Sequence, residues 1–168
     1  MLAAAAREPA NLVLGLDANA ASMAESSRRA ARPAAKGGLP NAWFIVAAAE
    51  APPAELHGVG NLVTVHFPWG SLLRGVTGRD DIVAAGLASL VAPAGALELL
   101  VAPLDRDRLD GVPTSAEDLV AGAAAAFAEH GFVIARSSRP AAAEVRATGS
   151  TWARRLDRQA TLIRLVRR

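Results

Sequence analysis

Hydrophobic residues occur along the 168-residue chain in two patterns, short continuous runs and longer stretches with helical spacing. The short runs predict buried strands at residues 12–16, 42–49, 62–67, 96–102, 132–135 and 161–166. The longer stretches predict helices at residues 2–8, 18–31, 79–92 and 115–130. Apolar strands that alternate with helices are typical of an α/β protein whose parallel sheet is covered on both faces.

Local signals refine this pattern at three places. Thr114 and Glu117 fit a capping box for the helix at 115–130. The last two strands have no well-patterned helix between them, so we expect one of them to run antiparallel to its neighbours. Gly58 and Gly60 lead into a strand rather than out of one, so we interpret this pair as a turn.

Length and composition exclude several classes of protein. The chain is long enough for one domain, and its 52% hydrophobic and 20% charged residues exclude a disordered chain. It has no cysteine, and none of His57, His66 and His130 stands beside a second ligand, so we expect no metal. The apolar uncharged stretch at residues 82–97 is too short to span a membrane, and the chain start does not resemble a signal peptide. We therefore expect a cytoplasmic protein.

Charge is distributed unevenly along the chain. Residues 136–168 contain nine arginines and two acidic residues, a net charge of +7, whereas residues 1–135 carry a net charge of −5. A basic segment on an acidic body is typical of a surface that faces a polyanion. A solvated tail explains the same charge equally well, and the charge alone does not choose between them.

Two acidic residues directly follow apolar strands. Asp17 ends the first strand and Glu50 follows the second. In open α/β sheets the ligand lies at the carboxyl ends of the strands, where a carboxylate can accept hydrogen bonds from both hydroxyls of a ribose. A helix cap is an equally good explanation of Asp17 alone. The repetition at Glu50 favours a ligand of the adenosine type.

The three tryptophans stand in different surroundings. Trp69 lies between Pro68 and Gly70 directly after a strand, where the backbone is held in a loop. Trp152 lies within the arginine-rich segment, and an indole beside guanidinium groups suits base stacking and phosphate binding. Packing of Trp152 on the sheet is the alternative explanation. Trp43 lies inside an apolar strand, and we expect it in the core.

Five segments occur in an order that matches a known family. They are GLDANAASM at 15–23, GGLPNA at 37–42, AAAEAPP at 47–53, FPWGSLLRG at 67–75 and STWARRL at 150–156. Together these segments resemble the kanamycin–apramycin resistance 16S ribosomal RNA methyltransferases, which methylate N1 of an adenine in the decoding site. The resemblance covers nearly the whole chain, and the segment at 67–75 is its most specific part.

The resemblance implies the fold of a class I S-adenosylmethionine methyltransferase, Rossmann-like and mostly parallel, with an antiparallel strand near the C-terminus. It also implies where the cofactor S-adenosylmethionine binds. Asp17 holds the cofactor ribose, Ala49 and Glu50 lie against its adenine, and Phe67 and Ser71 line the methyl-donor pocket. Residues 1–168 then form a single methyltransferase-like domain.

For the RNA, the resemblance implies a target adenine flipped between two tryptophans, Trp69 and Trp152. It also implies that RNA phosphates are held by Arg155 and its basic neighbours Arg154, Arg158 and Arg146, so that residues 136–168 face the RNA. The partner would be 16S rRNA in the 30S ribosomal subunit. We expect the protein itself to be a monomer.

One feature of the family is missing from the sequence. Full members begin with a strand and a loop similar to Gly-Thr-Gly-Asp-Gly that cradles the methionine part of the cofactor, and the first glycine here is Gly15. We therefore expect an N-terminally truncated domain, either because the start codon was placed too late or because the protein is a truncated copy. An inactive module that binds rRNA without methylating it is the alternative function. A nicotinamide-dependent oxidoreductase is a third, which explains Asp17 but neither Trp69 nor Trp152.

Overall fold

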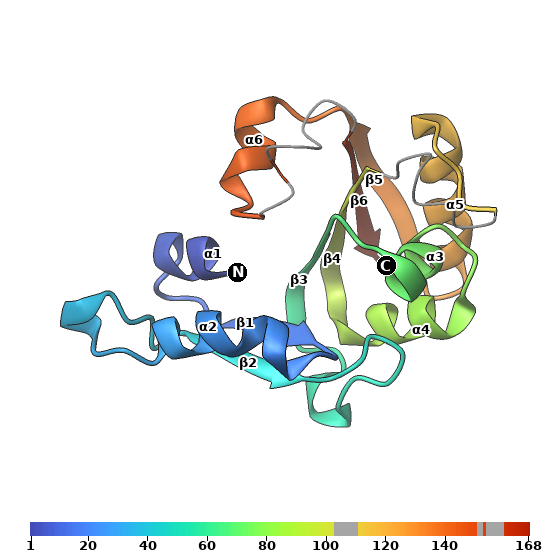
Figure 1. The fold of residues 1–168 in the computed structure, drawn as a ribbon. Helices are drawn as coiled ribbons and strands as arrows, with labels where there is room; N and C mark the ends of the chain where they lie inside the picture. Colours follow the sequence, from blue (N-terminus) through green and yellow to red (C-terminus); the bar gives the residue numbers. More distant parts are fainter. Residues whose placement is uncertain (103–110, 151–152, 154–159) are drawn as a thin grey trace.

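A computed structural model describes residues 1–102, 111–150, 153 and 160–168 (Figure 1). Its strands are β1 (Val13–Asp17), β2 (Ala42–Val46), β3 (Gly60–His66), β4 (Val91–Val101), β5 (Phe132–Ser138) and β6 (Thr161–Arg167). Its α-helices are α1 (Leu2–Arg7), α2 (Ala20–Ala30), α3 (Gly70–Val76), α4 (Asp81–Leu90), α5 (Ala116–Ala128) and α6 (Ala142–Ala147). Two short 3-10 helices, η1 (Ala34–Lys36) and η2 (Ala54–Leu56), lie in the connections before and after β2.

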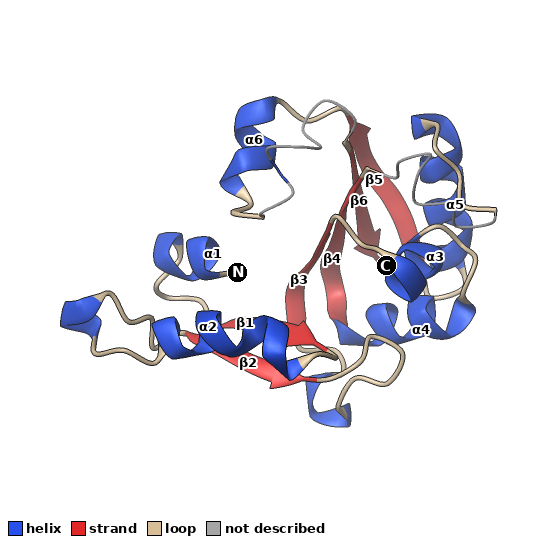
Figure 2. Cartoon of the chain, viewed as in Figure 1, coloured by secondary structure: helices blue, strands red, loops and turns tan. Residues whose placement is uncertain are grey.

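The strands form two sheets (Figure 2). In the smaller sheet β1 pairs with β2 in parallel, and in the larger one the order is β3-β4-β6-β5. Strand β3 is parallel to β4, whereas β6 is antiparallel to both β4 and β5. The α/β architecture with an antiparallel strand near the C-terminus is therefore confirmed. The sequence did not indicate the division into two sheets, because the apolar pattern of a strand does not reveal which strands pair.

The main core lies between the larger sheet and helices α3, α4 and α5. The helical spacing expected for α4 is present, since Val83, Ala84 and Leu87 are buried on one face. Phe127 of α5 packs edge-on against Phe132 of β5, with ring centroids 5.8 Å apart. This core fixes α3 and α4 against the sheet and thereby places the loop between β3 and α3.

A smaller cluster joins α1 and α2 to the β1–β2 sheet. Ala5, Ala30 and Ala42 are buried there, with Phe44 packed against them. Neighbouring residues of a strand point to opposite faces, so Trp43 lies on the other side of β2. Its side chain is 60% exposed, and its Nε1–H donates to a backbone carbonyl. The prediction of a core position for Trp43 is wrong.

Two helices and one cap differ from the sequence-based expectation. The structure adds α3 and α6, which are short, six or seven residues each, and therefore show little periodicity. The N-cap of α5 is Ser115, whose hydroxyl accepts from the N–H of Asp118 at 3.1 Å, and not Thr114 as expected. Across the described ranges, none of the helices is long and apolar enough to cross a membrane.

Candidate functional site

Asp17 ends β1 with its side chain exposed. Its Oδ1 accepts a hydrogen bond from the N–H of Asn19 at 2.8 Å, and its Oδ2 accepts one from the Ser22 hydroxyl at 2.7 Å. The N-cap of α2 is Asn19, so capping does not explain Asp17. The two bonds orient the carboxylate, and each oxygen keeps a lone pair that can accept from a ligand hydroxyl.

The chain after β2 lies beside both the Asp17 loop and α4. The N–H of Ala47 donates to the Asp17 carbonyl at 3.1 Å, which brings the Ala49–Glu50 segment to the end of β1. A Cβ at Gly86 of α4 would lie 1.8 Å from the Ala49 carbonyl oxygen, so the helix can approach this closely only with glycine there. Ala49 is half-buried and packs on the main core, whereas the Glu50 side chain is exposed.

The loop between β3 and α3 has an unusual backbone. Phe67 has a φ of +51°, a left-handed conformation that a non-glycine residue rarely adopts, while its N–H donates to the Leu100 carbonyl at 2.7 Å. Such strain is often found at functional sites. Trp69 follows with 70% of its surface exposed, and Gly70 has a φ of +60°. Ser71, the second residue of α3, is half-buried.

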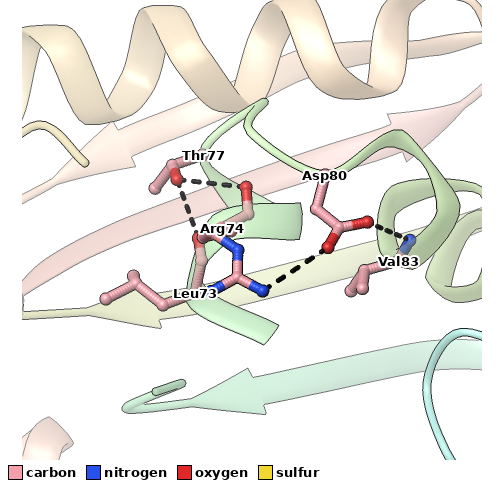
Figure 3. A network of polar contacts seen from close by, with 5 residues as sticks. All are labelled: Leu73, Arg74, Thr77, Asp80 and Val83. Carbon is pink, nitrogen blue, oxygen red and sulfur yellow. Dashed lines mark hydrogen bonds and ion pairs between the residues drawn. The ribbon is translucent and has the colours of Figure 1, made fainter. Parts of the chain in front are cut away.

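A network of polar contacts joins the end of α3 to the start of α4 (Figure 3). The buried hydroxyl of Thr77 donates to the Leu73 carbonyl at 2.7 Å. Arg74 pairs with Asp80 at 3.9 Å, and Asp80 caps α4 by accepting from the N–H of Val83 at 3.3 Å. The helix that follows Trp69 is therefore tied to the helix on which the Ala49–Glu50 segment packs. Hydrogen bonds and packing contacts thus link the three parts of the chain that hold the candidate residues: the end of β1, the loop after β2 and the start of α3.

His66 is a residue at this edge to which the sequence analysis assigned no role. It ends β3 next to Phe67 and is half-buried. Burial lowers the pKa of its imidazole, the positive amino group of Met1 lowers it further, and Glu98 acts in the opposite direction. The ring is therefore neutral near pH 7. The described residues contain no group of three or more metal-ligating side chains.

Two arginines of the arginine-rich segment make contacts with β4 and with the end of α4. Arg164 pairs with Glu98 at 3.2 Å, and Arg167 donates to the Val91 carbonyl at 2.7 Å near the end of α4. These two arginines thus contribute to folding. Arg146, in the last turn of α6, is exposed. The remaining predicted contacts lie outside the described residues: Trp152, Arg154, Arg155 and Arg158.

A second basic surface lies at the end of α2, where Arg28, Arg29, Arg32 and Lys36 are all exposed. The sequence carried a signal for it that we did not use, since four cations fall within nine residues. Four cations this close together provide a surface for phosphate groups.

The α/β fold, with a mixed sheet and a carboxylate at the end of β1, is that of the class I S-adenosylmethionine methyltransferases, as the likeness to solved structures shows. Solved structures of this class superimpose on nearly the whole chain. The aminoglycoside resistance methyltransferase NpmB1 has a TM-score of 0.81 at 32% identity, over 99% of this chain and 81% of NpmB1. A tryptophan-to-alanine variant of the 16S rRNA (adenine(1408)-N(1))-methyltransferase of Catenulisporales acidiphilia, solved with its cosubstrate SAM, has a TM-score of 0.82. It is 32% identical over 99% of this chain and 79% of that one.

Residues 1–166 match the family described as "NpmA: 16S rRNA (adenine(1408)-N(1))-methyltransferase", and the chain belongs to this family. A relative with the same description, from Streptoalloteichus hindustanus, is 36% identical over 161 residues, which cover 91% of this chain and 73% of the relative. The family, the fold, the class of enzyme and the cosubstrate implied by the sequence resemblance are confirmed. The roles of individual residues stay predictions.

Proposed function

We propose that this chain transfers the methyl group of S-adenosylmethionine to N1 of a decoding-site adenine in 16S rRNA, acting as a monomer on the 30S subunit. The observation that carries the proposal is Trp69, a large aromatic side chain that is 70% exposed on a strained loop at the end of β3. An exposed indole held in this way suits stacking on an extruded base.

The residues that fit the cofactor are those at the strand ends. The oriented carboxylate of Asp17 would accept from the ribose hydroxyls, and the backbone at Ala49 and Glu50 would lie against the adenine. Phe67 and Ser71 would line the pocket of the reacting methyl group. When bound, the cofactor supplies a methyl group that is already activated by its sulfonium sulfur.

The protein then needs little acid–base chemistry. Adenine N1 carries a lone pair at neutral pH, so no base is needed to activate it. Trp69 and Trp152 would hold the flipped adenine with N1 in line with the methyl group and would exclude water. Catalysis on this proposal consists mainly of positioning.

Two basic surfaces would hold the RNA backbone. One includes Arg146 with Arg154, Arg155 and Arg158, so that residues 136–168 face the RNA within a single domain of residues 1–168. The other is the end of α2 with Arg28, Arg29, Arg32 and Lys36. Methylation in the cytoplasm, where the subunits are, would give resistance to aminoglycosides that bind the decoding site.

The test is methyl transfer from radiolabelled S-adenosylmethionine to 30S subunits of a susceptible bacterium. Primer extension should stop at the target adenine, because a methyl group on N1 blocks Watson–Crick pairing. Trp69→Ala should lower the rate roughly 5- to 150-fold, the equivalent of about 1–3 kcal/mol of stacking. Cofactor affinity, measured by calorimetry, should not change.

Trp43→Ala is the matched control, because Trp43 is equally large and similarly exposed but lies on β2. It should methylate like the unsubstituted chain. A normal rate in Trp69→Ala would show that the site assignment is wrong. Binding to 30S subunits without any binding of S-adenosylmethionine would instead establish the alternative, an rRNA-binding module without activity.

A further inference from the structure

The two faces of the larger sheet are covered to different extents. Helices α3, α4 and α5 lie on one face, whereas α6 lies on the other, which we call the outer face (Figure 1). Val145 of α6 packs on Leu100 and Leu162, which are opposite each other on β4 and β6. The helix therefore covers the row of side chains near the end of β4 and leaves the next row of the outer face accessible.

That next row is polar and crosses all four strands of the sheet. Its members, in register from β3 to β5, are Thr64, Glu98, Arg164 and Arg136. Thr64 and both arginines are exposed, and Glu98 is half-buried. Two arginines face one glutamate, so the row keeps one positive charge without a negative charge to balance it.

A β-bulge in β5 places Arg136 on the outer face. The register shifts between Ile134 and Arg136, with Ala135 as the additional residue. Ile134 packs against the main core, and regular alternation would point the side chain two residues later at the same core. The extra residue reverses this, so Arg136 points outward. Bulges are often found where a strand has to re-aim a functional side chain.

The bulge brings two positive charges together, because Arg136 lies directly opposite Arg164 on β6. The Cβ atoms of such a pair are about 4.5–5.5 Å apart, and like charges at this position destabilise a sheet. Glu98 accepts a hydrogen bond from Nη1 of Arg164 at 3.2 Å, whereas Arg136 forms no ion pair within the described ranges. The Arg164 side chain is 44% exposed and keeps further N–H donors for a ligand.

We propose that Arg136 and Arg164 together bind a phosphate group of the RNA backbone on the outer face. An anion between the two guanidinium groups would replace their repulsion with two attractions, and guanidinium N–H groups match phosphate oxygens in geometry. RNA is the favoured source of the phosphate because α6, beside this row on the same face, carries the exposed Arg146. The inference rests on the proposed function and adds to it a contact made by the sheet itself.

The first test is the affinity of Arg136→Gln for 30S subunits, measured at several salt concentrations. Loss of one phosphate contact should raise the dissociation constant roughly fivefold at about 0.15 M salt and reduce the slope of log K against log salt by about 0.7–0.9. Arg136→Lys keeps the charge and should keep the slope. Unchanged affinity and slope in Arg136→Gln would overturn the proposal.

Arg79→Gln is the matched control for the loss of one positive charge. Arg79 is exposed in the connection between α3 and α4, on the opposite side of the larger sheet. This variant should bind 30S subunits with the affinity and slope of the unsubstituted chain. An equal change in Arg79→Gln and Arg136→Gln would mean that the net charge, and not the pair on the outer face, determines binding.

Thermal unfolding of the free protein separates binding from a structural role. Arg136→Gln removes a like charge opposite Arg164, so its melting temperature should not fall. Arg136→Glu places an opposite charge there and should melt at a higher temperature than Arg136→Gln, although it should bind 30S subunits more weakly. A lower melting temperature in both variants would show that Arg136 supports the fold, and would overturn the proposal.

Protein-free 16S rRNA identifies the source of the negative charge. A loss of affinity seen with 30S subunits but not with protein-free rRNA would indicate an acidic ribosomal protein and would overturn the proposal. If the unsubstituted chain methylates 30S subunits and Arg136→Gln binds them normally, only this inference fails. If Arg136→Gln weakens binding but the unsubstituted chain transfers no methyl group, the result counts against the proposed function alone.

Discussion

Asp17 has a side chain whose orientation is set by its own loop. The bonds from Asn19 and Ser22 use one acceptor position on each carboxylate oxygen. Neither bond is needed to cap α2, because Asn19 does that. The carboxylate is exposed and its orientation is fixed, and it forms no ion pair with α2. It is therefore suited to accept hydrogen bonds from two hydroxyl groups of a ligand.

Asp17→Asn tests this role at a single residue. The amide keeps one carbonyl acceptor but replaces the other oxygen with a donor, so one ribose hydroxyl loses its partner. Hydrogen bonds to a charged group contribute about 1.5–3 kcal/mol, so affinity for S-adenosylmethionine should fall roughly 10- to 150-fold by calorimetry. The melting temperature should hardly change because the residue is exposed. Ser22→Ala, which removes only the orienting hydroxyl, should cost less; equal affinity of Asp17→Asn and the unsubstituted chain would exclude the role.

Between elements, the close approach of α4 to the loop after β2 depends on Gly86. In Gly86→Ala the new methyl group must displace the Ala49 carbonyl, although alanine is favoured over glycine within a helix by about 1 kcal/mol. We therefore expect weaker binding of S-adenosylmethionine together with a lower melting temperature. In Gly122→Ala of α5 the methyl group meets the Thr77 carbonyl instead, at 2.6 Å. That control should also lose stability but should keep its affinity for S-adenosylmethionine; an equal loss of affinity in both variants would contradict a specific effect of the contact between α4 and the loop.

At the junction of α3 and α4, the Asp80 side chain makes two contacts, the cap of α4 and the ion pair with Arg74. We predict that they contribute unequally to the free energy of unfolding. Asp80→Ala removes the cap of α4, which should cost about 0.5–2 kcal/mol. Arg74→Gln removes only the ion pair, whose 3.9 Å separation and 41% exposed arginine indicate a contribution of about 0–1 kcal/mol. Thermal unfolding should therefore show a larger decrease for Asp80→Ala. A decrease of equal size in both variants would mean that the ion pair, and not the cap, holds the junction.

The sequence predicted well those elements whose hydrophobic pattern is long or is accompanied by strong local signals. The strand that ends at Asp17 and the helix with Val83 and Leu87 on one face were found in this way. Helix α6 was missed because six residues give less than two turns of periodicity. Trp43 was misplaced because an apolar strand does not reveal which of its faces a helix covers.

The candidate site could be predicted only where chemistry is visible in residue types. Carboxylates after strands and a tryptophan between Pro68 and Gly70 are such signals. The left-handed backbone of Phe67 and the contact at Gly86 depend on positions that no local pattern encodes.

At the scale of the whole molecule, the two sheets differ in how they are supported. Strands β4 and β6 each pair on both sides, and Leu97, Leu99 and Leu165 are completely buried. Strands β1 and β2 pair only with each other within the described part of the chain, and the cluster on their covered face has alanines as its buried members. Small side chains bury little apolar surface, so this sheet contributes less to the free energy of unfolding.

The rate of amide hydrogen exchange should therefore differ between the two sheets. Amides of β4 and β6 should exchange only through global unfolding, whereas those of β1 and β2 should exchange faster through local opening of the smaller sheet. Binding of S-adenosylmethionine at Asp17 and Ala49 would stabilise the closed state of that sheet, so it should slow exchange in β1 and β2 more than in β4 and β6. Mass spectrometry of peptides that cover residues 13–17, 42–46, 91–101 and 161–167 measures each rate. Equal protection of both sheets would mean that they unfold as one unit in spite of their separate hydrogen bonding. Cofactor protection confined to β4 and β6 would move the binding site away from the smaller sheet.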